Sequence, residues 1–151
     1  MTNSTHIFSF EKPEDNPGFL LWQVSMQWQL RMKKGLDPLG LTLTQFVLLA
    51  ALHWLSRSSE VVTQQVLAEH AKTDKMMTSK VLRTLQQKAL LTRAAHQIDT
   101  RAKILQLTPA GLALLKRAVA VVEQVDKAFF FPLQGQESNF NAYMQALYTQ
   151  A

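Results

Sequence analysis

The sequence predicts a mainly α-helical fold with a small β-hairpin, arranged as a winged helix-turn-helix with additional helices. Three observations support this fold class. A short helix and a basic amphipathic helix, separated by about four residues, form a helix-turn-helix pattern. Two short segments rich in strand-forming residues follow directly, at residues 90–92 and 104–107, around a charged loop. Thr108 and Pro109 then supply a strong helix start.

The N-terminal part predicts an arm and two helices. Residues 1–16 are polar, and we expect an arm there. Residues 17–40 are expected to form a dimerisation helix with Pro17 in its first turn. Its apolar arc is wide, so a second copy of the chain is the natural cover. In the following core helix, Thr42 and Gln45 stand at the spacing of a capping box.

Residues 41–107 are expected to hold the whole winged helix-turn-helix. After the core helix, the segment TQQVLAEHA predicts a short helix capped by Thr63. The loop between the two strands contains no Asn-Gly or Asp-Gly turn signal. The hairpin prediction therefore depends on the strand patterns and on the helix start that follows them.

The basic helix of the pair is capped by Thr73 or Asp74. Its inward stripe, at positions i, i+3, i+4 and i+7, consists of Thr78, Val81, Leu82 and Leu85. Met77 can replace Thr78 in this stripe, and the pattern leaves both choices open. On the opposite face, Lys80 and Arg83 can pair with phosphates or guanine edges. Met76 also points outward by helical phase, although filling a core is the usual role of methionine.

Residues 108–151 predict two C-terminal dimerisation helices. The first begins at Pro109 and stops at Pro132, and Ser138 can cap the second.

Composition narrows the possible function classes. The 151 residues are 47% apolar and 18% charged, which suits a packed domain. There is no cysteine, which excludes disulfides and thiolate metal sites. The N-terminus lacks the pattern of a signal peptide, and no apolar stretch approaches the roughly 18 residues of a membrane span. We therefore expect a cytoplasmic protein with no membrane association.

The positive charge is concentrated in the middle of the chain. The net charge is +5, and nine basic but only four acidic residues lie between Arg57 and Lys103. The rest of the chain carries seven of each and is neutral. A basic centre between neutral helical arms is typical of a nucleic-acid reader with a separate assembly region, although chance clustering is the alternative.

The most specific motif runs from Asp99-Thr100-Arg101-Ala102-Lys103 into Leu107-Thr108-Pro109-Ala110-Gly111. Together with GLTLTQFVLLAAL and the helix pair, it resembles the wing and helix restart of the MarR family of bacterial transcriptional regulators. The resemblance covers the chain from about Phe19 to the C-terminus. It implies a dimer, built from the first and last two helices of each subunit, that binds a pseudo-palindromic double-stranded operator and represses transcription. Many members release DNA when a small aromatic compound binds.

The resemblance also implies roles for single residues. Arg101 is similar to the wing-tip arginine that contacts DNA, and Asp99 to the partner that holds it by a salt bridge, with Arg93 as a second partner. The expected DNA-binding residues are Lys75, Met76, Met77, Ser79, Lys80, Arg83, Arg101 and Lys103.

Three positions depart from the family pattern. Ala89 stands where glycine is usual, just after the basic helix. A left-handed helix end there costs an alanine about 1 kcal/mol, unless the turn differs. Thr78 replaces an apolar residue, and Thr100 replaces a frequent second arginine, so this wing carries less charge than many.

Other function classes find less support. A winged helix that docks on protein instead of DNA is the main alternative. The four histidines show no metal-ligand spacing and no Gly-rich phosphate loop exists, so we expect no enzyme, metal or cofactor. Aromatic side chains that could line an effector pocket are Trp22, Trp28, Phe46, His53 and Trp54. The alternative is that these five are ordinary core or interface residues.

Overall fold

The computed structural model describes residues 7–58 and 61–150. This part of the chain holds six α-helices, a three-stranded sheet and three short 3-10 turns. The helices are α1 (Pro17–Leu36), α2 (Leu43–Ser56), α3 (Gln64–Ala71), α4 (Lys75–Gln87), α5 (Pro109–Phe130) and α6 (Glu137–Tyr148). The strands are β1 (Val62–Thr63), β2 (Leu91–Ala95) and β3 (Lys103–Leu107), and the turns η1 (Pro13–Asp15), η2 (Asp37–Leu39) and η3 (Phe131–Leu133). The mainly helical fold with a hairpin wing is confirmed.

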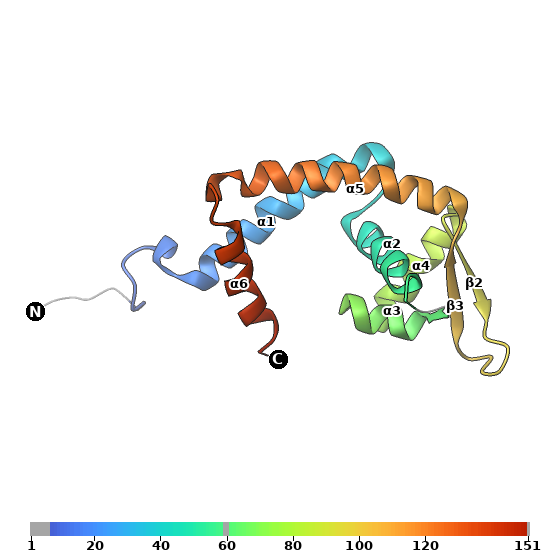
Figure 1. The fold of residues 1–151 in the computed structure, drawn as a ribbon. Helices are drawn as coiled ribbons and strands as arrows, with labels where there is room; N and C mark the ends of the chain where they lie inside the picture. Colours follow the sequence, from blue (N-terminus) through green and yellow to red (C-terminus); the bar gives the residue numbers. More distant parts are fainter. Residues whose placement is uncertain (1–6, 59–60, 151) are drawn as a thin grey trace, which may run out of the picture.

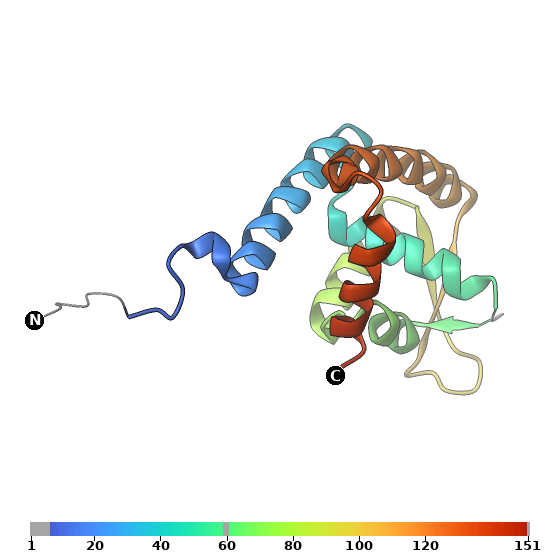
Figure 2. The same cartoon turned by 60° about the vertical axis from the view of Figure 1, so that its left-hand side comes forward.

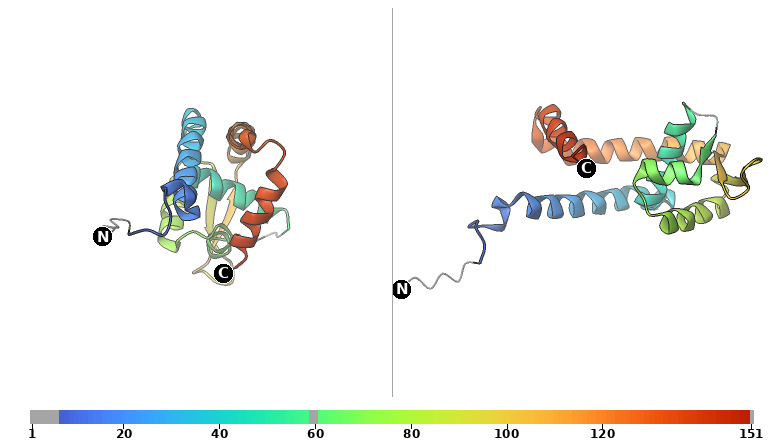
Figure 3. Two further views of the ribbon diagram at one scale, coloured as in Figure 1. Left: turned by 90° about the vertical axis from the view of Figure 1, so that its left-hand side faces the viewer. Right: turned by 90° about the horizontal axis from the view of Figure 1, so that it is seen from below.

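The two long helices, α1 and α5, lie side by side and run along the length of the molecule (Figure 1). The helix-turn-helix and the hairpin gather at one end, while α6 and the start of α1 lie at the other (Figures 2 and 3). The indole nitrogen of Trp28 donates to the Asp126 carboxylate across the α1–α5 contact, at 2.8 Å. Gly35 allows the close approach, because a Cβ there would lie 2.9 Å from Val121.

The core lies where the end of α1 meets the helix-turn-helix, the sheet and α5. Its fully buried members include Leu36, Leu48, Leu49, Leu52, Leu67, Leu82, Leu85, Leu91 and Leu105. Each such side chain contributes about 1.5–3 kcal/mol by leaving water. The predicted core helix α2 supplies three of these leucines, and the half-buried Phe46 packs against them. This core fixes the position of the basic helix α4.

Side-chain caps define the starts of five helices. Thr42 and Gln45 form the predicted reciprocal capping box of α2, and α1, α3, α4 and α5 are capped by Asn16, Thr63, Asp74 and Thr108. Asp74, and not Thr73, is therefore the cap of α4. The Ser138 cap was wrong: α6 begins one residue earlier at Glu137, without a side-chain cap.

The sheet extends the predicted hairpin by a third strand. Strands β2 and β3 pair antiparallel from Leu91↔Leu107 to Ala95↔Lys103. Strand β1 pairs with the other edge of β3 at Val62↔Leu105. Two residues are too few to show strand periodicity, so β1 could not be predicted. The third strand ties the hairpin to the start of α3.

Thr78, and not Met77, completes the inward stripe of α4. Thr78 is fully buried, whereas 42% of Met77 is exposed. The Thr78 hydroxyl donates to the Asp74 carbonyl oxygen at 2.7 Å and lies 2.6 Å from the Thr73 hydroxyl. A polar group can occupy this core position because its hydrogen bonds are satisfied locally.

Ala89 adopts the left-handed conformation that glycine usually supplies, with φ of 59°. Its N–H donates to the Gln86 carbonyl, and the N–H of Leu90 donates to the Leu85 carbonyl. These two bonds form a Schellman motif, and the apolar Leu90 and Leu85 both lie in the core beside it. The turn therefore has the geometry usual for glycine, and the alanine carries the steric cost.

The end of α4, the hairpin and the start of α5 meet at one junction. The N–H of Thr108 donates to the Leu90 carbonyl at 3.2 Å, and the Thr108 hydroxyl donates to the Ala89 carbonyl at 2.7 Å. The same hydroxyl caps α5 by accepting from the Gly111 N–H at 3.0 Å. A Cβ at Gly111 would overlap the Leu90 carbonyl group. Only glycine permits α5 to start this close to the end of α4.

No single helix within residues 7–58 and 61–150 is long and apolar enough to cross a membrane. The segments Pro17–Leu39 and Leu43–Ser56 meet the length and composition only as a pair, bent by 78°.

Replacing Ala89 by glycine is expected to stabilise the protein. The free energy of unfolding should rise by about 0.5–1 kcal/mol, because glycine adopts positive φ without a Cβ penalty. Urea denaturation measures the change. Ala94→Gly is the control, at an exposed position of β2. It should lower stability, because glycine weakens a strand. Equal effects of both substitutions would contradict this account of the turn.

Candidate nucleic-acid interface

The outward face of α4 is basic and open to solvent. Lys75, Lys80 and Arg83 are exposed, and Met76 is 83% exposed, which confirms its outward helical phase. Ser79 lies half-buried at the edge of this face. The carboxylate of Asp74 caps α4 by accepting the Met77 N–H at 2.9 Å. It forms no ion pair within 4.0 Å with the lysine and arginine side chains of this face. This face can reach a polyanion without rearrangement.

The loop between β2 and β3 is held by hydrogen bonds between residues two or three positions apart. Nδ1 of His96 accepts the N–H groups of Ile98 and Asp99, at 3.1 and 3.2 Å. Asp99 Oδ1 in turn accepts the backbone N–H of Arg101 at 3.1 Å. The side chains of Arg101 and Lys103 are exposed on this hairpin. The loop thus presents two free cations on a fixed backbone.

The expected salt bridges of Asp99 were wrong. Among the described residues, the ion pair within 4.0 Å is Lys33–Asp37 on α1. Asp99 orders the loop through a backbone N–H of Arg101 instead of its guanidinium. A short carboxylate at a tight turn meets nearby N–H groups more readily than a long flexible side chain.

Arg93 supports the wing from a different side than expected. Its Nη2 donates to Gln64 Oε1 at 2.8 Å, which joins β2 to the first residue of α3. Its Nε is buried and has no hydrogen-bond partner within the described residues. Burial, and to a smaller extent the positive charge of Arg83, lower the pKa of Arg93. Among the described residues, neither Arg83 nor Arg93 forms an ion pair with a carboxylate.

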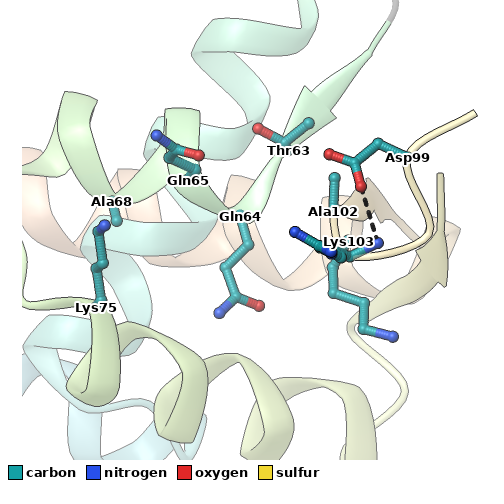
Figure 4. A pocket seen from close by; sticks show the side chains of 9 residues that line it. Thr63, Gln64, Gln65, Ala68, Lys75, Asp99, Ala102 and Lys103 are labelled. Atoms are coloured by element: carbon teal, nitrogen blue, oxygen red, sulfur yellow. Dashed lines mark hydrogen bonds between the residues drawn. The ribbon is translucent and has the colours of Figure 1, made fainter.

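A cavity of about 350 Å³ lies between the helix-turn-helix and the wing (Figure 4). Its lining brings together the predicted residues Lys75, Arg101 and Lys103 with Asp99. It also contains Gln64, which sequence reasoning missed. A glutamine directly after a helix cap carries no distinctive signal, so only the fold reveals its position.

The five aromatic and histidine candidates for an effector pocket lie in different surroundings. Trp22 and Trp54 are 65% and 61% exposed, and the Arg57 guanidinium lies 5.4 Å from the Trp54 ring centroid. Trp28 is tied to α5, and Phe46 packs against the core. His53 lines a separate cavity beside β3 and the start of α5.

A different cavity lies open beside α1 and the start of α2. Its volume is about 630 Å³, and its lining is largely apolar, with Met26, Leu30 and Leu43. Lys33 and Asp37 form their ion pair at its edge. Three glutamines, Gln23, Gln27 and Gln29, also line the cavity.

The described residues contain no group of three or more metal-ligating side chains that could hold a metal ion.

Sequence comparison identifies relatives over most of the chain. Residues 39–126 match a family model described as an ArnR1-like winged-helix domain. The chain is 39% identical over 138 residues to YdcH of Bacillus subtilis, an uncharacterised HTH-type transcriptional regulator, with 91% of this chain and 93% of the relative covered. It is 34% identical over 136 residues to an HTH-type transcriptional repressor of Mycobacterium bovis, covering 89% and 95%.

Solved structures share the fold at lower identity. A MarR-family regulator from Rhodococcus sp. RHA1 has a TM-score of 0.80 at 22% identity, covering 94% of this chain and 99% of that one. A mutant Escherichia coli MarR complexed with operator DNA has a TM-score of 0.77 at 21% identity, covering 90% and 96%. BpsR of Bordetella bronchiseptica, whose DNA binding is regulated by 6-hydroxynicotinic acid, has a TM-score of 0.80 at 23% identity, covering 94% and 99%.

The matched winged-helix model, the regulators that are similar over nine-tenths of the sequence and the shared fold agree with the motif at the hairpin and its helix restart. The protein belongs to the HTH-type transcriptional regulators with an ArnR1-like winged-helix domain, and it has the fold of the solved MarR-family regulators.

Proposed function

We propose that this regulator is a homodimeric repressor that binds a pseudo-palindromic operator and releases it when a small aromatic compound binds. The observation that carries the proposal is the set of exposed cations on α4 and the hairpin, of which Lys75, Arg101 and Lys103 line one cavity. The solved E. coli MarR complex with operator DNA supports the same use of this fold. A regulator with this role acts in the cytoplasm, where bacterial DNA lies, and needs no catalytic group.

Each part of the interface suits a different contact. Helix α4 fits the major groove, where Lys80 and Arg83 can pair with guanine edges or phosphates and Met76 with a thymine methyl. Lys75, Met77 and Ser79 lie at its edges toward the DNA backbone. The hairpin places Arg101 and Lys103 toward the minor groove and its phosphates. Phosphate contacts supply most of the affinity, and base contacts supply the sequence preference.

Dimerisation is supported by apolar surface far from this face. Helix α6 is fully described and contains no buried residue. Its large apolar side chains Tyr143, Leu147 and Tyr148 are 62–72% exposed. Leu21 and Trp22 of α1 are also more than 60% exposed at the same end of the molecule. Large apolar side chains that gather on an exposed surface are typical of an interface. A second copy would cover them and set two α4 helices about 34 Å apart on DNA.

Effector release is supported by the cavity beside α1 and α2. It lies between the proposed assembly region and the helix-turn-helix, so an occupant could bias their arrangement. A ring would pack against Met26 and Leu30, with a carboxylate near Lys33. The effect of 6-hydroxynicotinic acid on BpsR shows that this fold can respond to a small aromatic acid.

Arg101→Ala should weaken DNA binding about equally for all operator variants. Loss of one phosphate contact should reduce the slope of log affinity against log salt by about 1. Fluorescence anisotropy with labelled duplexes at several salt concentrations measures both values. Arg117→Ala is the control, because Arg117 is exposed and lies on α5, outside the wing. Unchanged affinity and slope would contradict the wing assignment, and a wild-type protein that ignores polyanions at low salt would favour a protein-docking module.

Leu147→Glu should shift the protein from dimer to monomer and weaken operator binding, because a buried charge opposes apolar association. Analytical ultracentrifugation measures the assembly state. Gln145→Glu adds the same charge on α6 without removing apolar surface, and should leave the dimer intact. A wild-type monomer would argue against the proposed assembly.

Salicylate should quench tryptophan fluorescence and release bound DNA. Lys33→Gln should weaken both responses, because it removes the cation at the cavity edge. Lys34→Gln is the matched control, since the neighbouring lysine does not line this cavity. Absence of any response over a panel of aromatic acids would argue against an effector site in this cavity.

A further inference from the structure

Gln64 occupies a central position in the cavity between α4 and the hairpin. Figure 4 shows its side chain extending into the space between Lys75 of α4 and Lys103 of β3. Arg93 donates to its Oε1 at 2.8 Å. The amide nitrogen makes no hydrogen bond with any residue that the structure describes. The contact with Arg93 therefore leaves an oriented donor in an open cavity.

The charges around Gln64 favour an anion. Lys75, Arg101 and Lys103 line the same cavity, and one oxygen of its lining carboxylate, Asp99, already accepts a backbone N–H. Within residues 7–58 and 61–150, the Arg93 guanidinium forms no ion pair with a carboxylate, and its buried Nε has no hydrogen-bond partner. The start of α3 adds the partial positive charge of a helix N-terminus. The lining therefore carries three cationic side chains against one carboxylate, which gives this cavity an excess of positive charge.

The position between two DNA-reading elements identifies the anion. If α4 lies in the major groove and the hairpin in the adjacent minor groove, the sugar-phosphate strand that separates the grooves must cross between them. Gln64 stands at that crossing. A bidentate contact with adenine needs the glutamine oxygen as an acceptor, and Arg93 already engages that oxygen. A phosphate needs only the free donor.

We propose that Gln64 is a DNA-contacting residue that donates to a backbone phosphate, and that Arg93 is the positioning residue that orients it. The inference rests on the proposed function and adds a contact outside α4 and the wing tip. It assigns sequence-independent affinity to a neutral side chain on the first helix of the pair.

The opposing explanation is that Gln64 and Arg93 form only a structural link. Gln64→Glu separates the two roles. A glutamate keeps the oxygen that Arg93 binds and strengthens that link as an ion pair, but it replaces the free donor with a charge that repels phosphate. A structural link would be preserved in this variant, whereas a phosphate contact would be lost.

The experiment measures the affinity of the full-length protein for two duplexes, one enriched from a random pool by the wild type and one of mixed sequence. Gln64→Glu should weaken binding to both at least about tenfold, without lowering the thermal unfolding midpoint. Gln64→Ala should weaken both about fivefold and leave the salt slope unchanged, because the lost donor is neutral. Gln106→Glu, exposed on β3, controls for the change in net charge.

A double-mutant cycle tests the positioning role. Arg93→Ala should weaken binding in the wild type but have little further effect in Gln64→Ala, because it acts through the missing amide. An independent phosphate contact by Arg93 would instead give additive losses and a smaller salt slope.

Three results would overturn the proposal. Gln64→Ala could bind like the wild type, Gln64→Glu could match Gln106→Glu, or the loss could be confined to particular base pairs, which would make Gln64 a base reader. In each of these cases the wild type still binds DNA and the proposed function stands. A wild type that binds neither duplex would overturn both.

Discussion

The contact between Gly111 and the carbonyl group of Leu90 constrains the whole architecture. Leu90 follows the left-handed end of α4, and Gly111 lies in the first turn of α5. Thr108 joins the two by bonding to Ala89 and Leu90 while capping α5. The end of the basic helix α4, both outer ends of the hairpin and the start of α5 are therefore fixed at one point. Their relative orientation follows from backbone packing and leaves little freedom.

The three described acidic residues of the basic segment, Glu69, Asp74 and Asp99, form no ion pair within 4.0 Å with its described cations. Asp74 caps α4, Asp99 orders the hairpin loop, and Glu69 accepts from Gln65 at 3.2 Å. Carboxylates that serve backbone and amide groups leave lysine and arginine side chains unpaired. Arg93, crowded by Arg83 and partly desolvated, is the clearest example. The protein tolerates this repulsion, which a bound polyanion would relieve.

Local chemistry made much of the fold predictable. Caps, helix periodicity and the Thr108-Pro109 restart locate the helices because they act within one turn of chain. The choice of Thr78 over Met77 was not predictable, since it depends on hydroxyl partners that only the folded turn supplies. Contacts across the fold were missed for the same reason: Gln64 meets Arg93 from 29 positions away, and the Asp99 salt bridge was replaced by a shorter-range bond. The five candidates for an effector pocket lie in different surroundings within the single chain, because aromatic character does not encode the direction of a side chain.

Helix α6 is largely exposed, since only Phe140 of its residues is half-buried, against Phe130. Under the proposed assembly, a second chain covers most of the remaining surface of α6, so mass action governs how much of it is protected. At low protein concentration a chain has no partner, and its C-terminal helix stays exposed to solvent. Exposed segments are preferred sites of proteolysis. Degradation would then remove solitary copies faster than assembled ones. Cellular levels of the protein would respond to its synthesis with a threshold instead of in proportion.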